Sequence, residues 1–141
     1  MKIELSQELM GQIEAHCEAT YPNEGAGFIL GRVEGETVTI STLMPLDNKW
    51  EADEQYHRFV LDTQDFLKAE MAAAKQGVDL VGVFHSHPDH PSRPSEFDRD
   101  HALPNFAYLI TSVQQGKAAT TQAWRLTEER DKFSEDVLSI S

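Results

Sequence analysis

The sequence has one cysteine, no long hydrophobic run and few positive charges, and each shortage excludes a class of protein. Cys17 alone cannot form an internal disulfide or supply a cysteine-rich zinc site. No stretch approaches the roughly 18 apolar residues that a membrane-spanning helix needs. The first ten residues carry acidic side chains where a secretory signal would be basic and then apolar. We therefore expect a soluble, cytoplasmic protein.

The charge balance is strongly acidic. Lysine and arginine number 12 against 24 aspartates and glutamates, which gives a net charge of −12 with neutral histidines. Duplex nucleic acids and anionic membranes select basic surfaces, so we expect neither as the main partner. The length of 141 residues and the hydrophobic fraction of 40% suit one core. The sequence therefore predicts a single domain over residues 1–141.

Hydrophobic periodicity predicts two longer helices. The first has about three turns, begins after the cap residue Ser6 and ends at Tyr21–Pro22. Cys17 lies in this segment, and we interpret it as a small buried apolar residue rather than a reactive thiol. The second helix is bounded by the cap Asp62 and by Gly77. Its predicted buried face consists of Phe66, Leu67, Met71 and Ala74.

Apolar and β-branched residues predict the strands, and a short helix is expected to begin near Ser95. The predicted strands are 25–33, 37–46, 78–84, 105–113 and 119–126, with a frayed strand in 128–141. The first two form a hairpin, and 78–84 is apolar enough to be buried on both faces. Residues 47–58, which include Trp50, are expected to form a loop. This order predicts an α/β protein with a mixed sheet flanked by helices.

A cluster of histidines after the strand 78–84 gives the strongest functional signal. Four of the six histidines lie within residues 85–101. His85 and His87 are two residues apart in an extended segment, so their side chains point to one face with Cα atoms roughly 7 Å apart. Two imidazoles placed in this way can bind one tetrahedral zinc ion. The alternative is a polar strand end that faces solvent.

Acidic residues nearby could complete such a site. Asp98 follows His87 by eleven residues, and the intervening prolines stiffen the loop so that the carboxylate returns to the strand end. The alternative for Ser95 and Asp98 is a helix capping box. Two histidines and one carboxylate leave a position for water, as in catalytic zinc sites. Glu24 is the candidate general base, and its alternative is an ordinary exposed acid.

These residues resemble a known family. The string HSHPDHPSRPSEFD has the residue types and spacing of the signature of the JAMM (MPN+, Mov34/Pad1) metallopeptidases, and YPNEGAGFILGR is similar to their upstream glutamate segment. The resemblance extends from the first helix to residue 126. It implies a fold similar to the three-layer α/β/α sandwich of cytidine deaminases. It also implies an amide hydrolase with one zinc ion per chain.

The resemblance also implies a role for each site residue. His85, His87 and Asp98 would bind zinc, Glu24 would move a proton from the zinc-bound water to the leaving amine, and Ser95 would stabilise the oxyanion. Members with these residues cut after the C-terminal Gly-Gly of ubiquitin or ubiquitin-like proteins. Because this chain is short, we expect a small ubiquitin-like or sulfur-carrier protein as substrate.

Two other functions and several details stay open. One alternative is a non-catalytic MPN-type scaffold for protein interaction, which the full set of ligands disfavours. The other is the DNA-repair-associated branch of the superfamily, which the acidic composition disfavours. The sequence does not decide between linear and isopeptide bonds, and it leaves the oligomeric state open, a homodimer being one option. The roles of His57, His90, His101 and Trp50 are also open.

Overall fold

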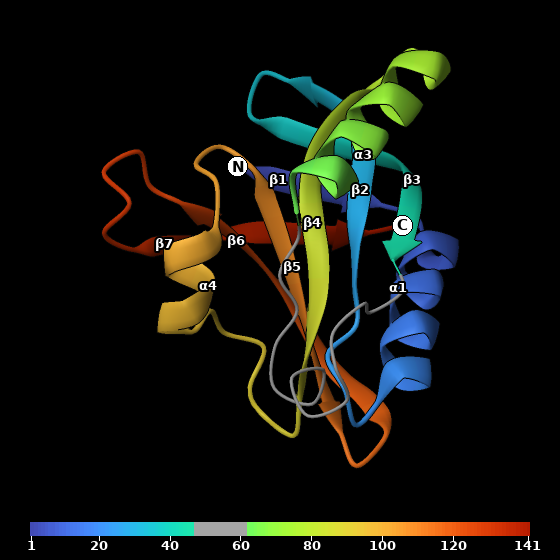
Figure 1. Ribbon diagram of the computed structural model, residues 1–141, viewed down its shortest axis with the longest axis vertical. Coiled ribbons are helices and arrows are strands. Elements are labelled where there is room, and N and C mark those ends of the chain that lie inside the picture. Colours follow the sequence, from blue (N-terminus) through green and yellow to red (C-terminus); the bar gives the residue numbers. More distant parts are fainter. Residues whose placement is uncertain (47–61) are drawn as a thin grey trace.

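A computed structural model of the protein describes residues 1–46 and 62–141 (Figure 1). The predicted loop at 47–58, with Trp50 and His57, lies outside the described residues. The helices are α1 (Gln7–Thr20), α3 (Thr63–Gln76) and α4 (Glu96–His101). The strands are β1 (Lys2–Leu5), β2 (Ala26–Glu34), β3 (Thr37–Leu46), β4 (Asp79–Pro88), β5 (Ala107–Gln114), β6 (Lys117–Leu126) and β7 (Phe133–Ile140).

The strands form one mixed sheet, which confirms the predicted α/β class. Their order is β1-β3-β2-β4-β5-β6-β7, and the sheet closes into a barrel because β1 pairs in parallel with both β3 and β7. Strands β4 and β5 are also parallel, whereas the other neighbouring pairs are antiparallel. The three-layer sandwich is therefore not confirmed. The sequence reading missed β1, whose four residues carry too short a pattern to predict a strand.

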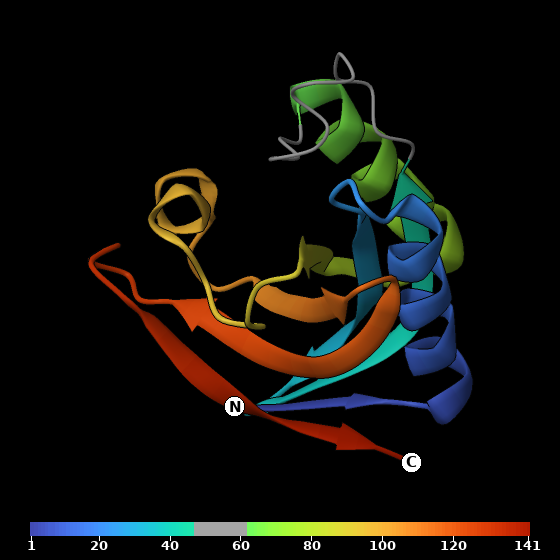
Figure 2. The ribbon, with the colours of Figure 1, turned by 90° about the horizontal axis from the view of Figure 1, so that it is seen from below.

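The central strands are buried on both faces, as predicted for the segment 78–84. One hydrophobic core lies between the sheet and α1, and the other lies beside α3. The first includes Ile13, Cys17, Ile29, Phe84 and Leu109. The second includes Phe28, Ala69, Val83, Ala102 and Tyr108. Figures 1 and 2 show that α4 stands apart from α1 and α3, at the other side of the molecule.

Helix α1 confirms two expectations about its sequence. The Ser6 hydroxyl accepts a hydrogen bond from the Leu9 backbone N–H at 3.1 Å, so Ser6 is the N-cap. Cys17 is fully buried, and burial raises the pKa of its thiol to about 12. At neutral pH the thiol is therefore protonated, and Cys17 acts as a core residue.

Helix α3 has the predicted ends but a different buried face. Asp62 forms a capping box with Asp65, and Gly77 ends the helix at a φ of 70°. The predicted face is wrong because Leu67 and Met71 are 56% and 55% exposed. The buried positions are Asp65, Ala69 and Ala73, with Phe66 partly buried. The small alanines let the helix lie close to the sheet. The prediction chose the larger side chains because a pattern of hydrophobicity favours them as the buried face.

Strands β2 and β3 form the predicted hairpin. Their paired residues run from Ala26 opposite Leu46 to Glu34 opposite Thr37, with one irregularity after Leu30. Gly35 in the turn has a φ of 63°, a conformation that glycine adopts without strain. None of the helices described here is long and apolar enough to cross a membrane.

Candidate metal centre and active site

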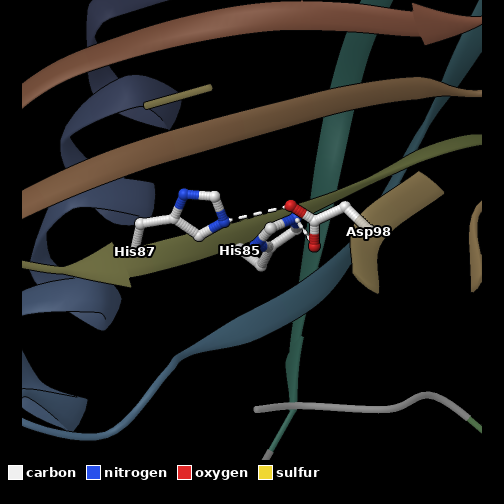
Figure 3. Close-up of side chains that lie close together, drawn as sticks. All are labelled: His85, His87 and Asp98. Atoms are coloured by element: carbon white, nitrogen blue, oxygen red, sulfur yellow. Dashed lines mark hydrogen bonds and ion pairs between the residues drawn. The ribbon is translucent and has the colours of Figure 1, made fainter. Parts of the chain in front are cut away.

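The alternation of β4 separates the four consecutive side chains at 84–87 onto two faces. Phe84 packs in the core against α1, so Ser86 points to the same side and is fully buried. His85 and His87 point to the opposite side, toward α4. Figure 3 shows both imidazoles on β4 directed at Asp98 of α4.

The two imidazoles and the carboxylate lie within contact distance. His87 Nε2 is 3.1 Å from Asp98 Oδ2, and His85 Nε2 is 3.5 Å from Asp98 Oδ1 (Figure 3). The possible ligand atoms of the three residues all lie within 4.8 Å of one another. Two imidazole nitrogens and one carboxylate oxygen are a donor set that suits Zn²⁺. The residues present therefore fit the predicted metal.

Ser95 and Asp98 also form the capping box that was the alternative interpretation. The Ser95 hydroxyl accepts from the Asp98 backbone N–H at 3.1 Å, and the Ser95 N–H donates to Asp98 Oδ2 at 2.8 Å. The same carboxylate oxygen contacts His87. The two interpretations are therefore compatible, because the cap directs the carboxylate toward β4.

The loop between β4 and α4 is held by side chains that bind its carbonyl groups. Three successive carbonyls each accept a hydrogen bond. The pairs are Ser112 Oγ with His90 O at 2.6 Å, His87 Nδ1 with Pro91 O at 2.9 Å and Trp124 Nε1 with Ser92 O at 2.9 Å. The Pro91 carbonyl requires a hydrogen on His87 Nδ1, so Nε2 is the nitrogen available to a metal. Sequence reasoning missed Ser92 and Trp124, because bonds to backbone carbonyls leave no residue spacing to detect.

The three residues perturb one another's ionisation. Burial lowers the pKa of His85. Burial also acts to lower the pKa of His87, but the hydrogen bond and negative charge of Asp98 outweigh it and raise that pKa. Burial acts to raise the pKa of Asp98, yet the two histidines and the Ser95 N–H hold it below its usual range. Without metal, His87 therefore holds its proton to a higher pH than an ordinary histidine, and Asp98 stays ionised to a lower pH than an ordinary aspartate. A metal ion would replace the proton on His87.

An open cavity of about 700 Å³ lies in front of these residues. Its lining includes Glu24, His87, Ser95 and Asp98, so Glu24 reaches the site from a distant part of the sequence. The negative charge of Glu24 contributes to the raised pKa of His87. His90 also lines the cavity, whereas the ring of His101 stacks on Phe97 with centroids 4.1 Å apart.

Asp89 is a further residue that the sequence reading did not identify. It has a φ of 58°, and its carboxylate accepts hydrogen bonds from the Tyr21 hydroxyl at 2.6 Å and from the Gln115 N–H at 2.8 Å. The hydrogen bond from Tyr21 lowers the pKa of Asp89. The start of the loop between β4 and α4 is thereby joined to the end of α1 and to the turn after β5. The Pro-Asp pair directly after a strand was the available signal, since aspartate favours such turns.

The fold and this site define a JAB-type domain. Residues 6–127 match the family described as prokaryotic homologs of the JAB domain. The match covers most of the chain, and the protein belongs to this family. A JAB1/MPN domain protein from Archaeoglobus fulgidus has the same fold, with a TM-score of 0.60 at 19% identity over 100% of this chain and 97% of that one.

Other similar proteins come from several organisms. A probable TtuB-protein conjugate cleaving protease from Thermus thermophilus is 32% identical over 72% of this chain and 64% of its own length. A desampylase from Haloferax volcanii is 35% identical over 64% of this chain and 63% of its own length. The chain thus spans less than two thirds of either relative. The solution structure of a Desulfitobacterium hafniense protein has a TM-score of 0.84 at 29% identity, over 100% of this chain and 93% of that one.

Proposed function

We propose that the protein is a zinc-dependent peptidase of the JAMM type. Its reaction would be hydrolysis of the amide bond after the C-terminal Gly-Gly of a ubiquitin-like or sulfur-carrier protein. The observation that carries the proposal is the convergence of His85, His87 and Asp98, whose ligand atoms lie within 4.8 Å of one another. His87 and Asp98 share one cavity with Glu24 and Ser95. The cytoplasm is the proposed location, and the acidic charge balance disfavours a nucleic acid or membrane partner.

The names of the relatives support the type of substrate. One is named for cleaving TtuB-protein conjugates and the other is a desampylase. The convergence of two histidines, an aspartate, a glutamate and a serine is unnecessary for a protein that only binds a partner. We therefore favour hydrolysis over a non-catalytic scaffold.

The side chains of the site have complementary tasks. Zn²⁺ held by His85, His87 and Asp98 would supply Lewis-acid activation of a water molecule and of the substrate carbonyl. Glu24 would accept a proton from the attacking water and deliver it to the nitrogen of the breaking C–N bond. The products are a carboxylic acid and an amine.

Ser95 can serve the same reaction without leaving its cap. Its oxygen accepts from the Asp98 N–H, which leaves the hydroxyl hydrogen free to donate elsewhere. Ser95 lines the cavity, so this hydrogen can reach an oxyanion there. The helix cap would thereby hold the donor in place for the reaction.

The proposal is tested with a ubiquitin-like carrier that bears a C-terminal extension after Gly-Gly. Mass spectrometry would locate the cut made by the zinc-loaded protein. Glu24→Gln is nearly isosteric and should retain zinc and melting temperature while losing turnover, because an amide cannot accept the proton. Glu34→Gln, at the other end of β2, is the matched control and should cleave like the parent.

Three results would contradict this proposal. Absence of cleavage by the zinc-loaded parent on a panel of such carriers would favour the scaffold function. Normal turnover of Glu24→Gln with intact zinc would exclude the proposed mechanism. Full zinc content in a variant with both His85→Ala and His87→Ala would exclude the proposed ligands.

A further inference from the structure

We propose that Ser86 is a positioning residue for Glu24, an inference that rests on the function proposed above. Ser86 lies between the two candidate ligands His85 and His87, but its side chain points to the opposite face of β4. It does not line the cavity, and it is fully buried on the side of α1. Any effect of Ser86 on the reaction must therefore pass through another residue.

The residue through which Ser86 acts is Gly25, directly after Glu24. The Gly25 N–H donates to Ser86 Oγ at 2.8 Å, and the Ser86 N–H donates to the Gly25 carbonyl at 2.9 Å. Ser86 thus binds both backbone groups of Gly25. The regular pairing of β2 with β4 ends one step earlier, at Ala26 opposite His85. The Ser86 hydroxyl therefore supplies an acceptor that continues the pairing as far as the residue next to the proposed base.

Gly25 has little freedom to move on its other side. A Cβ atom at this position would lie 2.6 Å from Thr20 Oγ1 and 3.4 Å from His16 Cδ2 of α1. The backbone after Glu24 is thus enclosed between α1 and β4. Ser86 also lies beside the Cys17 thiol of α1, where its side chain acts to lower the pKa of that thiol. The backbone next to Glu24 is consequently held from the α1 side of the sheet, while Glu24 itself lines the cavity on the opposite side.

This arrangement makes a defined kinetic prediction. A general base must lie within hydrogen-bond distance of the proton it accepts, and a displacement of about 1 Å can cost a hundredfold in rate. Ser86→Ala removes the acceptor of the Gly25 N–H and leaves the imidazoles and the cavity lining unchanged. We expect kcat to fall by about ten- to a hundredfold. KM and zinc affinity should stay within about twofold of the parent, because the variant leaves the proposed metal ligands and the residues that line the cavity in place.

A second measurement reports the contact without any turnover. In the parent, the Gly25 N–H donates to Ser86, so we expect its exchange with solvent to be slow. In Ser86→Ala this exchange should be about fivefold faster or more, as expected for the loss of one hydrogen bond. Ser86→Thr retains a hydroxyl and should restore slow exchange and most of kcat, and Ser86→Cys, of similar size, is the substitute if threonine is not accommodated.

Cys17→Ala is the matched control. It removes the thiol beside Ser86 but leaves the two hydrogen bonds between Ser86 and the Gly25 backbone. If Ser86 only fills the core, Cys17→Ala and Ser86→Ala should lower the melting temperature by similar amounts, and both variants should keep the parental kcat. A tenfold or greater loss of kcat in Ser86→Ala alone supports the inference.

The outcomes separate this inference from the function on which it rests. If the parent does not cleave the carrier, both fail together. If the parent cleaves and Glu24→Gln does not, but folded Ser86→Ala has parental kcat and parental Gly25 exchange, only the role of Ser86 is overturned. Loss of zinc from Ser86→Ala would also overturn it, because Ser86 would then position the ligands and not Glu24.

Discussion

Single residues of the site serve the fold and the chemistry together. Asp98 completes a capping box with Ser95 and contacts both imidazoles with the same carboxylate. His87 binds the Pro91 carbonyl with one ring nitrogen and faces Asp98 with the other. A substitution at either position would therefore change local structure and the proposed metal binding at once, and variants must be chosen to separate the two.

Ser95 allows such a separation. Ser95→Ala removes the cap oxygen and the hydroxyl donor, so stability should fall by about 1 kcal/mol and turnover by roughly 10²- to 10³-fold. Ser95→Thr keeps both groups and should retain most of each property. Urea unfolding and turnover of zinc-loaded protein are the measurements. Loss of stability with parental turnover in Ser95→Ala would limit Ser95 to capping.

Zinc affinity should depend on pH through one histidine. The pKa of His87 is raised, so His87 keeps a proton that metal must displace up to a higher pH than an ordinary histidine does, whereas the lowered pKa of His85 favours its neutral ring. As the pH falls below the raised pKa of His87, affinity should fall about tenfold per pH unit, as for release of one proton. Chelator competition over roughly pH 6 to 8 measures this slope. A slope near zero, or near two protons, would contradict it.

The sequence predicted the site residues by two different routes. His85, His87 and Asp98 followed from the alternation of a strand and from ligand chemistry, and the structure brings them together. Glu24 was a candidate base as an acid at the start of a glycine-rich strand, but its place beside the ligands came from the family resemblance, because residue spacing alone cannot bring it to the end of β4. Asp89 and Trp124 were missed, since each binds backbone groups that are distant in sequence.

At the scale of elements, β4 has a central position. It is paired on both sides, it has a core on each face, and it ends at the site. Its apolar run predicted this burial correctly. The face of α3 was not predictable in the same way, because the curved sheet accepts Ala69 and Ala73 and leaves Leu67 exposed. Packing of this kind depends on the partner surface, which the local sequence does not contain.

The loop after β4 provides a prediction at this scale. Trp124→Phe keeps an aromatic ring but removes the N–H that binds the Ser92 carbonyl. Stability should fall by about 1 kcal/mol, and zinc affinity by roughly tenfold, because the adjacent Pro91 carbonyl orients His87.

Tyr108→Phe is the control for this substitution. It removes a hydroxyl in the same core that accepts from the N–H of Leu103, a residue after α4 and outside the loop between β4 and α4, at 2.7 Å. Melting temperature should fall in both variants, and zinc affinity in Trp124→Phe alone. Equal zinc affinity in the two variants would show that the loop does not depend on the indole N–H.

At the scale of the whole molecule, closure of the barrel is the feature that the sequence did not predict. Strand β1 pairs with β7, from Lys2 opposite Val137 to Leu5 opposite Ile140. Contacts between residues so far apart in sequence produce no local pattern, and the four residues of β1 are extended mainly because β3 and β7 receive them.

Buried charge near this closure gives a prediction for global stability. Asp136 of β7 is buried and lies 3.0 Å from Arg125 and 3.3 Å from the N-terminal amine. Asp136→Asn should lower the free energy of unfolding by about 2 kcal/mol, because the cations lose their partner in a partly buried site. The adjacent Glu135→Gln is exposed and should change it by less than about 0.5 kcal/mol. Urea unfolding of both variants tests this, and equal stability would mean that the ion pair contributes nothing to closure.

The turn at Gly35 has a practical consequence. It follows β2, a strand of nine residues that begins just after Glu24, and nine residues of strand span roughly 25 to 30 Å, so the turn lies far from the cavity that Glu24 lines. Figure 1 shows the turn between β2 and β3 at the end of the hairpin. Exposed hairpin tips tolerate inserted residues at small cost. An affinity peptide inserted there would allow the protein to be immobilised, and a fluorophore attached there would allow binding to be followed optically. In both cases the cavity at the other end of β2 would stay accessible.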